Sequence, residues 1–210
     1  MKIEILDLGI NNLKSVVNAF QENLTVSDSL SIISDSSESL GPDLLVLPGL
    51  GSFEAGMQEI EKRNFDKLIR LSLEDGARLV GICLGMQLLG SYSEESKGVK
   101  GLNVIPGTSN KLVKQLKENI PNMGWASTIP KLDNDFLALS KDKDFYFVHS
   151  YAFEPENPEN ILCTTEYGES KFVSGVISKN VCGFQFHPEK SAKIGAELVS
   201  EIITWGKHEI

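Results

Sequence analysis

The chain has 210 residues, of which 41% are hydrophobic and 23% are charged, as in an ordinary globular protein. A chain of this length can bury roughly 70% of the surface that it exposes when unfolded, so its core needs no disulfide or metal. Its 29 acidic residues outnumber its 20 basic ones, and the net charge of −9 disfavours nucleic acid or an anionic membrane as a partner. No apolar run approaches the ~20 residues that cross a bilayer.

The cysteines, the histidines and the first residues of the chain exclude further classes. The beginning of the chain carries Glu4 and Asp7 within an apolar stretch and lacks the features of a secretory signal, so we expect a cytoplasmic location. The cysteines, Cys83, Cys163 and Cys182, are too scattered for a disulfide framework. The histidines form no cluster at metal-ligand spacing, so the sequence predicts no metal and no other cofactor.

The first half of the chain alternates strand and helix patterns. Strands are expected at residues 3–8, 29–33, 43–47 and 78–82, and helices at 13–24, 54–62 and 66–75. Asn12 is a candidate cap for the first helix, and Gly76 stands where a helix C-cap belongs. The run at 43–47 is apolar without a break, which indicates a strand covered on both faces of a parallel sheet.

The second half predicts shorter β-strands. They are expected at residues 109–116, 145–148, 161–165, 172–177 and 181–186. A closing helix over 192–206 places Ile194, Leu198, Ile202 and Trp205 on or near one stripe. No internal repeat or long linker interrupts the chain. We therefore expect one α/β domain over residues 1–210, built on a mixed sheet.

A glycine-flanked cysteine ends one of the predicted strands. In the segment Gly81-Ile82-Cys83-Leu84-Gly85 two glycines bracket a possible nucleophile, the form in which a strand turns sharply into a helix and raises one side chain. The positive end of the helix expected over 84–89 favours a thiolate over a thiol. We therefore interpret Cys83 as a nucleophile, and Cys163 and Cys182 as small buried hydrophobic residues.

A cysteine that cleaves an amide needs a proton carrier, because the amine leaves only when it is protonated. His208 lies near the end of the chain and is interpreted as a solvated residue. His149 ends a predicted strand and could line a pocket or serve a structural role. His187 follows another strand, and Glu189 could bind its far nitrogen, since residues i and i+2 of an extended chain point the same way. An ordinary loop is the alternative for this segment.

Backbone donors for an oxyanion are predicted at the same edge of the sheet. The segment Pro48-Gly49-Leu50-Gly51 follows a buried strand, and its glycines allow an N–H to turn inward. Together with the Leu84 N–H it would form a donor pair that stabilises a tetrahedral oxyanion by roughly 3 to 4 kcal/mol per donor. A simple strand-to-helix turn is the alternative.

Several segments carry a resemblance to a known family. GICLGMQLL around Cys83 and GFQFHPEKS around His187 and Glu189 closely resemble the triad-type class I glutamine amidotransferases. Five more segments are similar to the glutaminase subunits of imidazole glycerol phosphate synthases: DLGINNLKSVVNAF, LPGLGSFEAGM, SEE, PNMGWAS and YFVHSYAF. The resemblance implies a three-layer, flavodoxin-like α/β fold with a mixed, mainly parallel sheet and flanking helices.

The resemblance also implies a reaction and its site. L-Glutamine would be hydrolysed to L-glutamate and ammonia through a thioester on Cys83, with His187 and Glu189 completing the triad and the Leu50 N–H in the oxyanion hole. By similarity, the substrate would be held by Gly51, Gln87, Glu95, Ser150 and Tyr151.

A partner is implied as well. Asn12 and Trp125 match positions that in the family face a (βα)8-barrel cyclase, with which the chain would form a heterodimer. Ammonia would pass through that barrel to make imidazole glycerol phosphate and the purine precursor AICAR in histidine biosynthesis. The PNMGWAS segment departs from the family pattern, with Asn122 where histidine is common and Ala126 where asparagine is expected.

Three alternatives stay open. A paralogous subunit could feed ammonia to a synthase-like barrel that aminates a sugar for a surface polysaccharide. A free-standing cysteine hydrolase or peptidase could use the same nucleophile elbow, the sharp strand-to-helix turn at Cys83, and a histidine. A regulatory subunit could keep the fold without the activity, although all three triad positions are filled.

Overall fold

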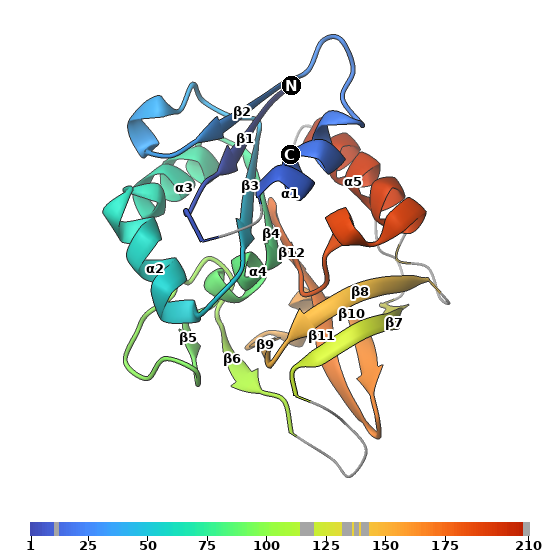
Figure 1. The fold of residues 1–210 in the computed structure, drawn as a ribbon. Coiled ribbons are helices and arrows are strands. Elements are labelled where there is room, and N and C mark those ends of the chain that lie inside the picture. The colour runs from blue at the N-terminus through green and yellow to red at the C-terminus, as the bar shows by residue number, and fades with distance from the viewer. Residues whose placement is uncertain (11–12, 114–119, 132–135, 137–138, 140–142, 208–210) are drawn as a thin grey trace.

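The computed structural model describes residues 1–10, 13–113, 120–131, 136, 139 and 143–207. Across its main sheet the described strands follow the order β2-β1-β3-β4-β12-β11-β10-β7-β8 (Figure 1). In chain order they are β1 (Lys2–Leu6), β2 (Ser29–Ile33), β3 (Leu44–Gly49), β4 (Arg78–Cys83), β7 (Asn122–Pro130), β8 (Asp144–His149), β10 (Ile161–Tyr167), β11 (Ser170–Ser178) and β12 (Val181–Phe184). This mixed sheet confirms the predicted α/β class.

The sheet has a parallel part and an antiparallel part. The strands from β2 to β12 in the spatial order pair in parallel, and those from β12 to β8 pair antiparallel. Parallel strands end at a common edge, and the carboxyl ends of β3, β4 and β12 therefore lie side by side. That edge is where the predicted nucleophile and oxyanion loop meet.

Helices cover both faces of the parallel part (Figure 1). They are α1 (Leu13–Gln21), α2 (Phe53–Lys62), α3 (Phe65–Glu74), α4 (Leu84–Leu88) and α5 (Ala192–Lys207). On β3, Leu44 and Val46 belong to a cluster with α1 and α5, whereas Leu45 and Leu47 belong to a cluster with the other three helices. Successive strand residues point to opposite faces, so an unbroken apolar run fills both layers.

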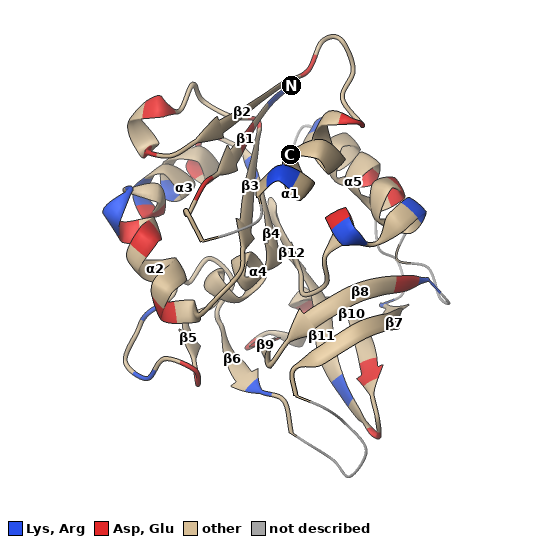
Figure 2. Ribbon diagram, in the orientation of Figure 1, with Lys and Arg blue, Asp and Glu red and all other residues tan. Residues whose placement is uncertain are grey.

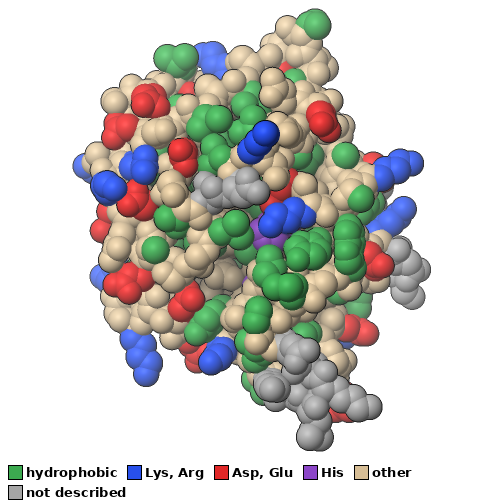
Figure 3. All heavy atoms as spheres, viewed as in Figure 1, with side chains coloured by type: hydrophobic (Ala, Val, Ile, Leu, Met, Phe, Trp, Pro, Cys, Tyr) green, Lys and Arg blue, Asp and Glu red, His purple; other side chains and the backbone are tan. Residues whose placement is uncertain are grey.

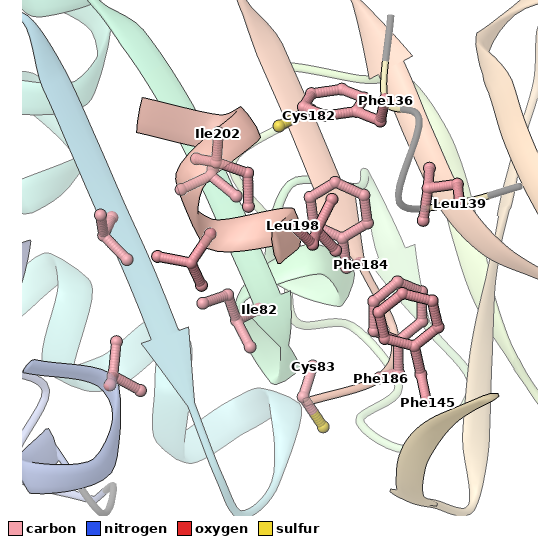
Figure 4. Packing of buried hydrophobic residues seen from close by; sticks show 14 of the residues in the cluster. Ile82, Cys83, Phe136, Leu139, Phe145, Cys182, Phe184, Phe186, Leu198 and Ile202 are labelled. Carbon is pink, nitrogen blue, oxygen red and sulfur yellow. The ribbon is translucent and has the colours of Figure 1, made fainter. Parts of the chain in front are cut away.

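Aromatic packing secures the antiparallel part of the sheet beside the site. Phe145 of β8 stacks on Phe186, with 4.1 Å between ring centroids, and Phe184 contacts Phe186 at 5.3 Å. Figure 4 shows these rings beside Leu198 of α5, with Cys83 at the end of its strand and its sulfur pointing away from them. The core therefore fixes the chain that leads into His187, and Cys83 lies at the edge of the same cluster with its sulfur directed away from the rings.

A second, smaller sheet lies beyond the carboxyl edge. It joins β5 (Tyr92–Ser93), β6 (Gly107–Lys111) and β9 (Tyr151–Pro155), and β9 pairs antiparallel with β6. The sequence did not predict β5, β7 or β9. Exposed and partly buried residues alternate along most of β7, including the large side chains Met123 and Trp125, so no inward apolar pattern marks it.

Several expected elements differ in length from those observed. The first helix ends at Gln21 instead of residue 24, and β12 ends at Phe184 instead of residue 186. The strand expected over 109–116 is observed as β6 up to Lys111, and residues 114–116 lie outside the described part. A strand ends where no neighbouring strand supplies hydrogen-bond partners, and helix ends fray over one or two residues; an apolar pattern in the sequence records neither.

Charged side chains are spread over the surface. Figure 2 shows acidic and basic residues intermixed on α2 and α3 and on α5. In the described ranges no helix is long and apolar enough to cross a membrane. Nor does any group of three or more His, Cys, Asp or Glu side chains within those ranges have the placement to hold a metal ion.

Candidate active site

Cys83 occupies a strained turn between β4 and α4. Its backbone has φ 54° and ψ −109°, a conformation that residues with a side chain rarely adopt. A Cβ on Gly85 would lie 1.8 Å from the Leu47 carbonyl oxygen, and one on Gly81 would lie 2.7 Å from the Gly85 carbonyl. Both glycines are required because strand and helix approach within a side chain's thickness, and this approach raises Cys83 above the sheet.

The oxyanion segment lies beside the cysteine. Gly49 of β3 pairs with Cys83 of β4 in the parallel register, so Leu50 and Gly51 follow at the same edge. Gly51 has φ 105°, a backbone conformation that favours glycine. Leu84 begins α4, so its N–H is among the first-turn donors that have no partner within a helix. The two predicted donors therefore come from neighbouring segments.

His187 and Glu189 form a close pair. Nδ1 of the imidazole lies 2.7 Å from Oε1 of Glu189, and both side chains are buried. The sequence argument expected extended chain between them, and this was wrong: Glu189 lies in the short 3-10 turn η4 (Pro188–Lys190), with His187 as its N-cap. The turn brings the carboxylate back to the ring because it folds the chain at Pro188.

The backbone of His187 is fixed on both sides. Its N–H donates to the Tyr146 carbonyl of β8 at 2.9 Å, and its carbonyl accepts from the Ser191 hydroxyl at 2.6 Å. The Ser191 oxygen in turn accepts the Tyr146 N–H at 3.0 Å. The sequence reasoning missed Ser191, a fully buried residue whose hydroxyl ties the turn η4 to β8 and so positions the imidazole.

The charge environment of His187 favours its protonated form. Burial by itself would lower the pKa of the imidazole, but the adjacent Cys83 and Glu189 side chains outweigh it and raise the pKa from 6.5 to about 9. Nε2 makes no hydrogen bond to the described residues, so Cys83 acts on the ring through charge and proximity and not through an aligned hydrogen bond. The free nitrogen is thus available to a reacting group.

The sulfur of Cys83 has two other neighbours. Nε2 of Gln185 donates to Sγ at 3.7 Å, and Sγ lies 3.9 Å from the Val148 carbonyl oxygen. The other two cysteines are fully buried, and burial raises the pKa of the Cys163 thiol to about 12 and that of the Cys182 thiol still higher. Of the three thiols, that of Cys83 is the one at the turn between β4 and α4, where it borders a cavity.

A cavity of about 200 Å³ opens beside this sulfur. Its lining includes predicted residues from several segments of the chain: Leu50, Gly51, Cys83, Leu84, Gln87, Glu95, Ser150 and Tyr151. A smaller hollow beyond Leu50 is lined by His187 and Glu189. Pockets for drug-sized ligands have about 300 Å³ or more, so this cavity suits a single small metabolite.

His149 has a structural role in this arrangement. Its Nδ1 lies 2.9 Å from the Tyr151 carbonyl oxygen, and its Nε2 lies 3.1 Å from Nδ2 of Asn122. Burial lowers the pKa of its imidazole to about 4, with a smaller contribution from the charge of His187. A neutral ring that donates through Nδ1 and accepts from Asn122 satisfies both contacts. His149 therefore braces the wall of the cavity.

The two predicted partner positions differ in what can be said of them. Trp125 is 53% exposed and lies edge-on to Tyr146, with 5.9 Å between ring centroids. The Tyr146 ring lies between Trp125 and His187, because its centroid is 6.5 Å from that of the imidazole. Figure 3 shows hydrophobic side chains gathered beside histidine atoms over this region. Asn12 lies outside the described residues.

The charges on the two buried imidazoles can be tested directly. In isotope-labelled protein, we expect one histidine NMR signal to titrate near pH 9 and another near pH 4, assigned to His187 and His149 by single substitutions. Glu189→Gln removes the carboxylate that stabilises the imidazolium, so the His187 titration should fall by about one pH unit or more. The His149 signal serves as the internal control. A His187 signal titrating at or below 6.5 would contradict the described pairing.

A thiol raised on a strained strand-to-helix turn, a buried His-Glu pair near it and a small cavity beside the sulfur are the parts of a Cys-His-Glu catalytic triad on an α/β fold. Residues 4–203 match the family model of glutamine amidotransferase class-I. The chain is 36% identical to imidazole glycerol phosphate synthase subunit HisH of Prochlorococcus marinus, covering 100% of this chain and 97% of the relative. It is 40% identical to the subunit of the same name from Pyrococcus furiosus, covering 94% and 96%.

A solved structure described as a glutamine amidotransferase superposes with a TM-score of 0.75 at 14% identity, covering 98% of this chain and 99% of that one, which shows the shared fold. The chain therefore belongs to the class I glutamine amidotransferase family, within which it groups with the HisH subunits.

Proposed function

We propose that the chain is a glutaminase subunit that hydrolyses L-glutamine to L-glutamate and ammonia through a thioester on Cys83. The observation that carries this proposal is the cavity, which brings the thiol together with Gln87 and Glu95 in a space fit for one amino acid. Family membership supports the same reaction.

The first half of the reaction forms the thioester. The Cys83 thiolate attacks the side-chain amide carbon of glutamine, and the resulting oxyanion is held by the N–H groups of Leu50 and Leu84. The His187 imidazolium gives its Nε2 proton to the amide nitrogen, the C–N bond breaks, and ammonia leaves. The raised pKa of His187 suits this step, because the imidazole is protonated at neutral pH.

The second half regenerates the enzyme. Neutral His187 takes a proton from water, the hydroxide attacks the thioester carbon, and the C–S bond breaks to release glutamate and the Cys83 thiolate. Glu189 is proposed to orient the ring through Nδ1 and to stabilise the imidazolium in both halves, as its 2.7 Å contact suggests.

The cavity walls suggest how the amino-acid end of glutamine is held. The Glu95 carboxylate suits the α-ammonium group, and backbone groups near Gly51, Ser150 and Tyr151 suit the α-carboxylate and the chain. Both N–H bonds of the Gln87 side-chain amide are used within the protein, toward Tyr151 and Gln185, so only its Oε1 remains to accept from the substrate.

We further propose that ammonia passes to a (βα)8-barrel cyclase subunit bound over the surface that carries Trp125, in a heterodimer of histidine biosynthesis. The relatives bear the name of a synthase subunit, which favours this acceptor over the polysaccharide paralogue. The exposed Met123 and Trp125 beside the triad suit a docking face, as large apolar side chains do. Asn12 is proposed for the same face on family resemblance, and the cytoplasmic location stays a prediction.

The proposal is tested by co-purifying the chain with the histidine-pathway cyclase encoded in the same genome. We expect the complex to release ammonia from glutamine and to make imidazole glycerol phosphate from glutamine as nitrogen donor, and the chain to rescue a histidine auxotroph lacking its own glutaminase subunit. The cyclase with added ammonium salt is the control. A complex that forms but uses only ammonium would refute the glutaminase role, and capture of a different barrel would support the paralogue.

A further inference from the structure

Gln185 is a buried polar residue in an apolar setting. It has no exposed surface, and it lies between Phe184 and Phe186, which belong to the hydrophobic core. A buried amide without partners would cost roughly 1 to 3 kcal/mol, so its contacts must compensate. Its Oε1 lies 3.0 Å from Nε2 of Gln87, and its Nε2 lies 3.7 Å from Sγ of Cys83. Both ends of the amide are therefore used, and one is used on the nucleophile.

A single carbonyl fixes the direction of both amides. The Tyr151 carbonyl can only accept, so the group of Gln87 that lies 2.9 Å from it must be the NH2 group. That same NH2 group faces Gln185, which must therefore present its oxygen to Gln87. If the Gln185 amide were flipped, its NH2 group would face the NH2 group of Gln87, and two donors would oppose each other. The only orientation that satisfies both contacts directs the Gln185 NH2 group at the sulfur.

We propose that Gln185 stabilises the Cys83 thiolate by donating an amide N–H to Sγ, in an orientation set by the Tyr151 carbonyl through Gln87. This inference rests on the proposed glutaminase function for its catalytic meaning, but the donor role is a property of the protein without substrate. The residue adds a fixed donor to a triad that otherwise reaches the sulfur through His187.

The sulfur then has a donor on one side and an acceptor on the other. As a thiol, Cys83 can donate toward the Val148 carbonyl, 3.9 Å away. Loss of the proton turns that contact unfavourable and strengthens the one to Gln185, because hydrogen bonds to a charged form favour that form. The contact from Gln185, held in place by Gln87 and the Tyr151 carbonyl, thus favours deprotonation of Cys83 and orients the thiolate.

The experiment measures alkylation of Cys83 by iodoacetamide as a function of pH, followed by intact-protein mass spectrometry. Alkylation reports the thiolate and needs neither glutamine nor a partner. Cys163 and Cys182 are fully buried, and Cys83→Ala supplies the background rate. The folded state of each variant is checked by circular dichroism at every pH.

Gln185→Met keeps the length of the side chain and removes the donor. We expect the pH of half-maximal alkylation to rise by about one unit, with the same limiting rate at high pH. Gln87→Met leaves Gln185 free to turn, and a smaller shift in the same direction is expected. Thr204→Ala removes a hydroxyl on α5 that bonds the Ser200 carbonyl within the same helix, and should leave the profile unchanged.

The outcomes distinguish a hydrogen-bond donor role of Gln185 from a role in which its side chain only fills space. A folded Gln185→Met protein whose alkylation profile matches the wild type would overturn the proposal, even if glutamine hydrolysis were lost. If that variant does not fold, Gln185→Glu carries the same test, because it keeps the acceptor for Gln87 and replaces the donor with a carboxyl oxygen; an unshifted profile would again be decisive. Absence of glutaminase activity in the wild-type complex would refute the proposed function but would leave the alkylation shifts intact.

Discussion

Cys83→Ala is expected to lower glutamine hydrolysis by at least ~10,000-fold, because the thioester cannot form without the sulfur. The fold should survive. The side chain is 5% exposed and ends in a cavity, so losing Sγ opens no void in the core. Alanine also tolerates the observed φ of 54° about as well as cysteine does, since both carry one unbranched Cβ.

The measurement is ammonia release by the complex with the cyclase, with the affinity of the two chains determined in parallel. We expect binding of the cyclase to be retained and ammonium-dependent synthesis to continue. Cys163→Ala is the matched control: it removes a thiol that is 1% exposed and lies on β10, and it should keep the glutaminase rate within a few-fold. Hydrolysis that survives in the Cys83→Ala complex would show that another group is the nucleophile.

Gly85→Ala should strongly destabilise the fold beside the site. The new Cβ would lie 1.8 Å from the Leu47 carbonyl oxygen and 2.9 Å from its carbon, and neither backbone atom can turn aside as a side chain can. Helix α4 would have to move away from β3. We expect a loss of about 3 kcal/mol or more of unfolding free energy, together with loss of Cys83 alkylation because the elbow is displaced.

Urea unfolding followed by circular dichroism measures this effect. Gly206→Ala is the control within the same chain: it adds the same methyl group near the end of α5, where the nearest atom is the flexible Met1 sulfur at 3.1 Å. Alanine has a better helix propensity than glycine, so this variant should unfold within about 1 kcal/mol of the wild type. Equal midpoints for the two variants would mean that α4 and β3 are not packed as described.

The candidate site divides into parts that local sequence predicted and parts that it did not. The elbow at Cys83 was predictable because its glycines, strand and helix are contiguous. The pairing of His187 with Glu189 was predicted, but through extended chain and not through the turn that is observed. Gln185 was overlooked, although a glutamine inside an otherwise apolar strand end could have been noticed as a buried polar group in need of partners.

By itself, the sequence determined the α/β class, the apolar strands β3 and β4 and the amphipathic helix α5, and it singled out Cys83 as the candidate nucleophile. Each of these depends on residues that are neighbours along the chain, where periodicity, glycine placement and helix polarity act. The segments that resemble the family extended the prediction to residues that line the cavity.

Only the tertiary structure decided which groups meet around the sulfur. The order β3-β4-β12 places His187 beside Cys83, and the antiparallel strand β8 brings the Val148 carbonyl to the same point. The direction of the Gln185 amide depends on Gln87 and on a carbonyl of β9. These contacts join residues far apart in the chain, and strand order and hydrogen-bond direction are set by packing of the whole domain rather than by any local pattern.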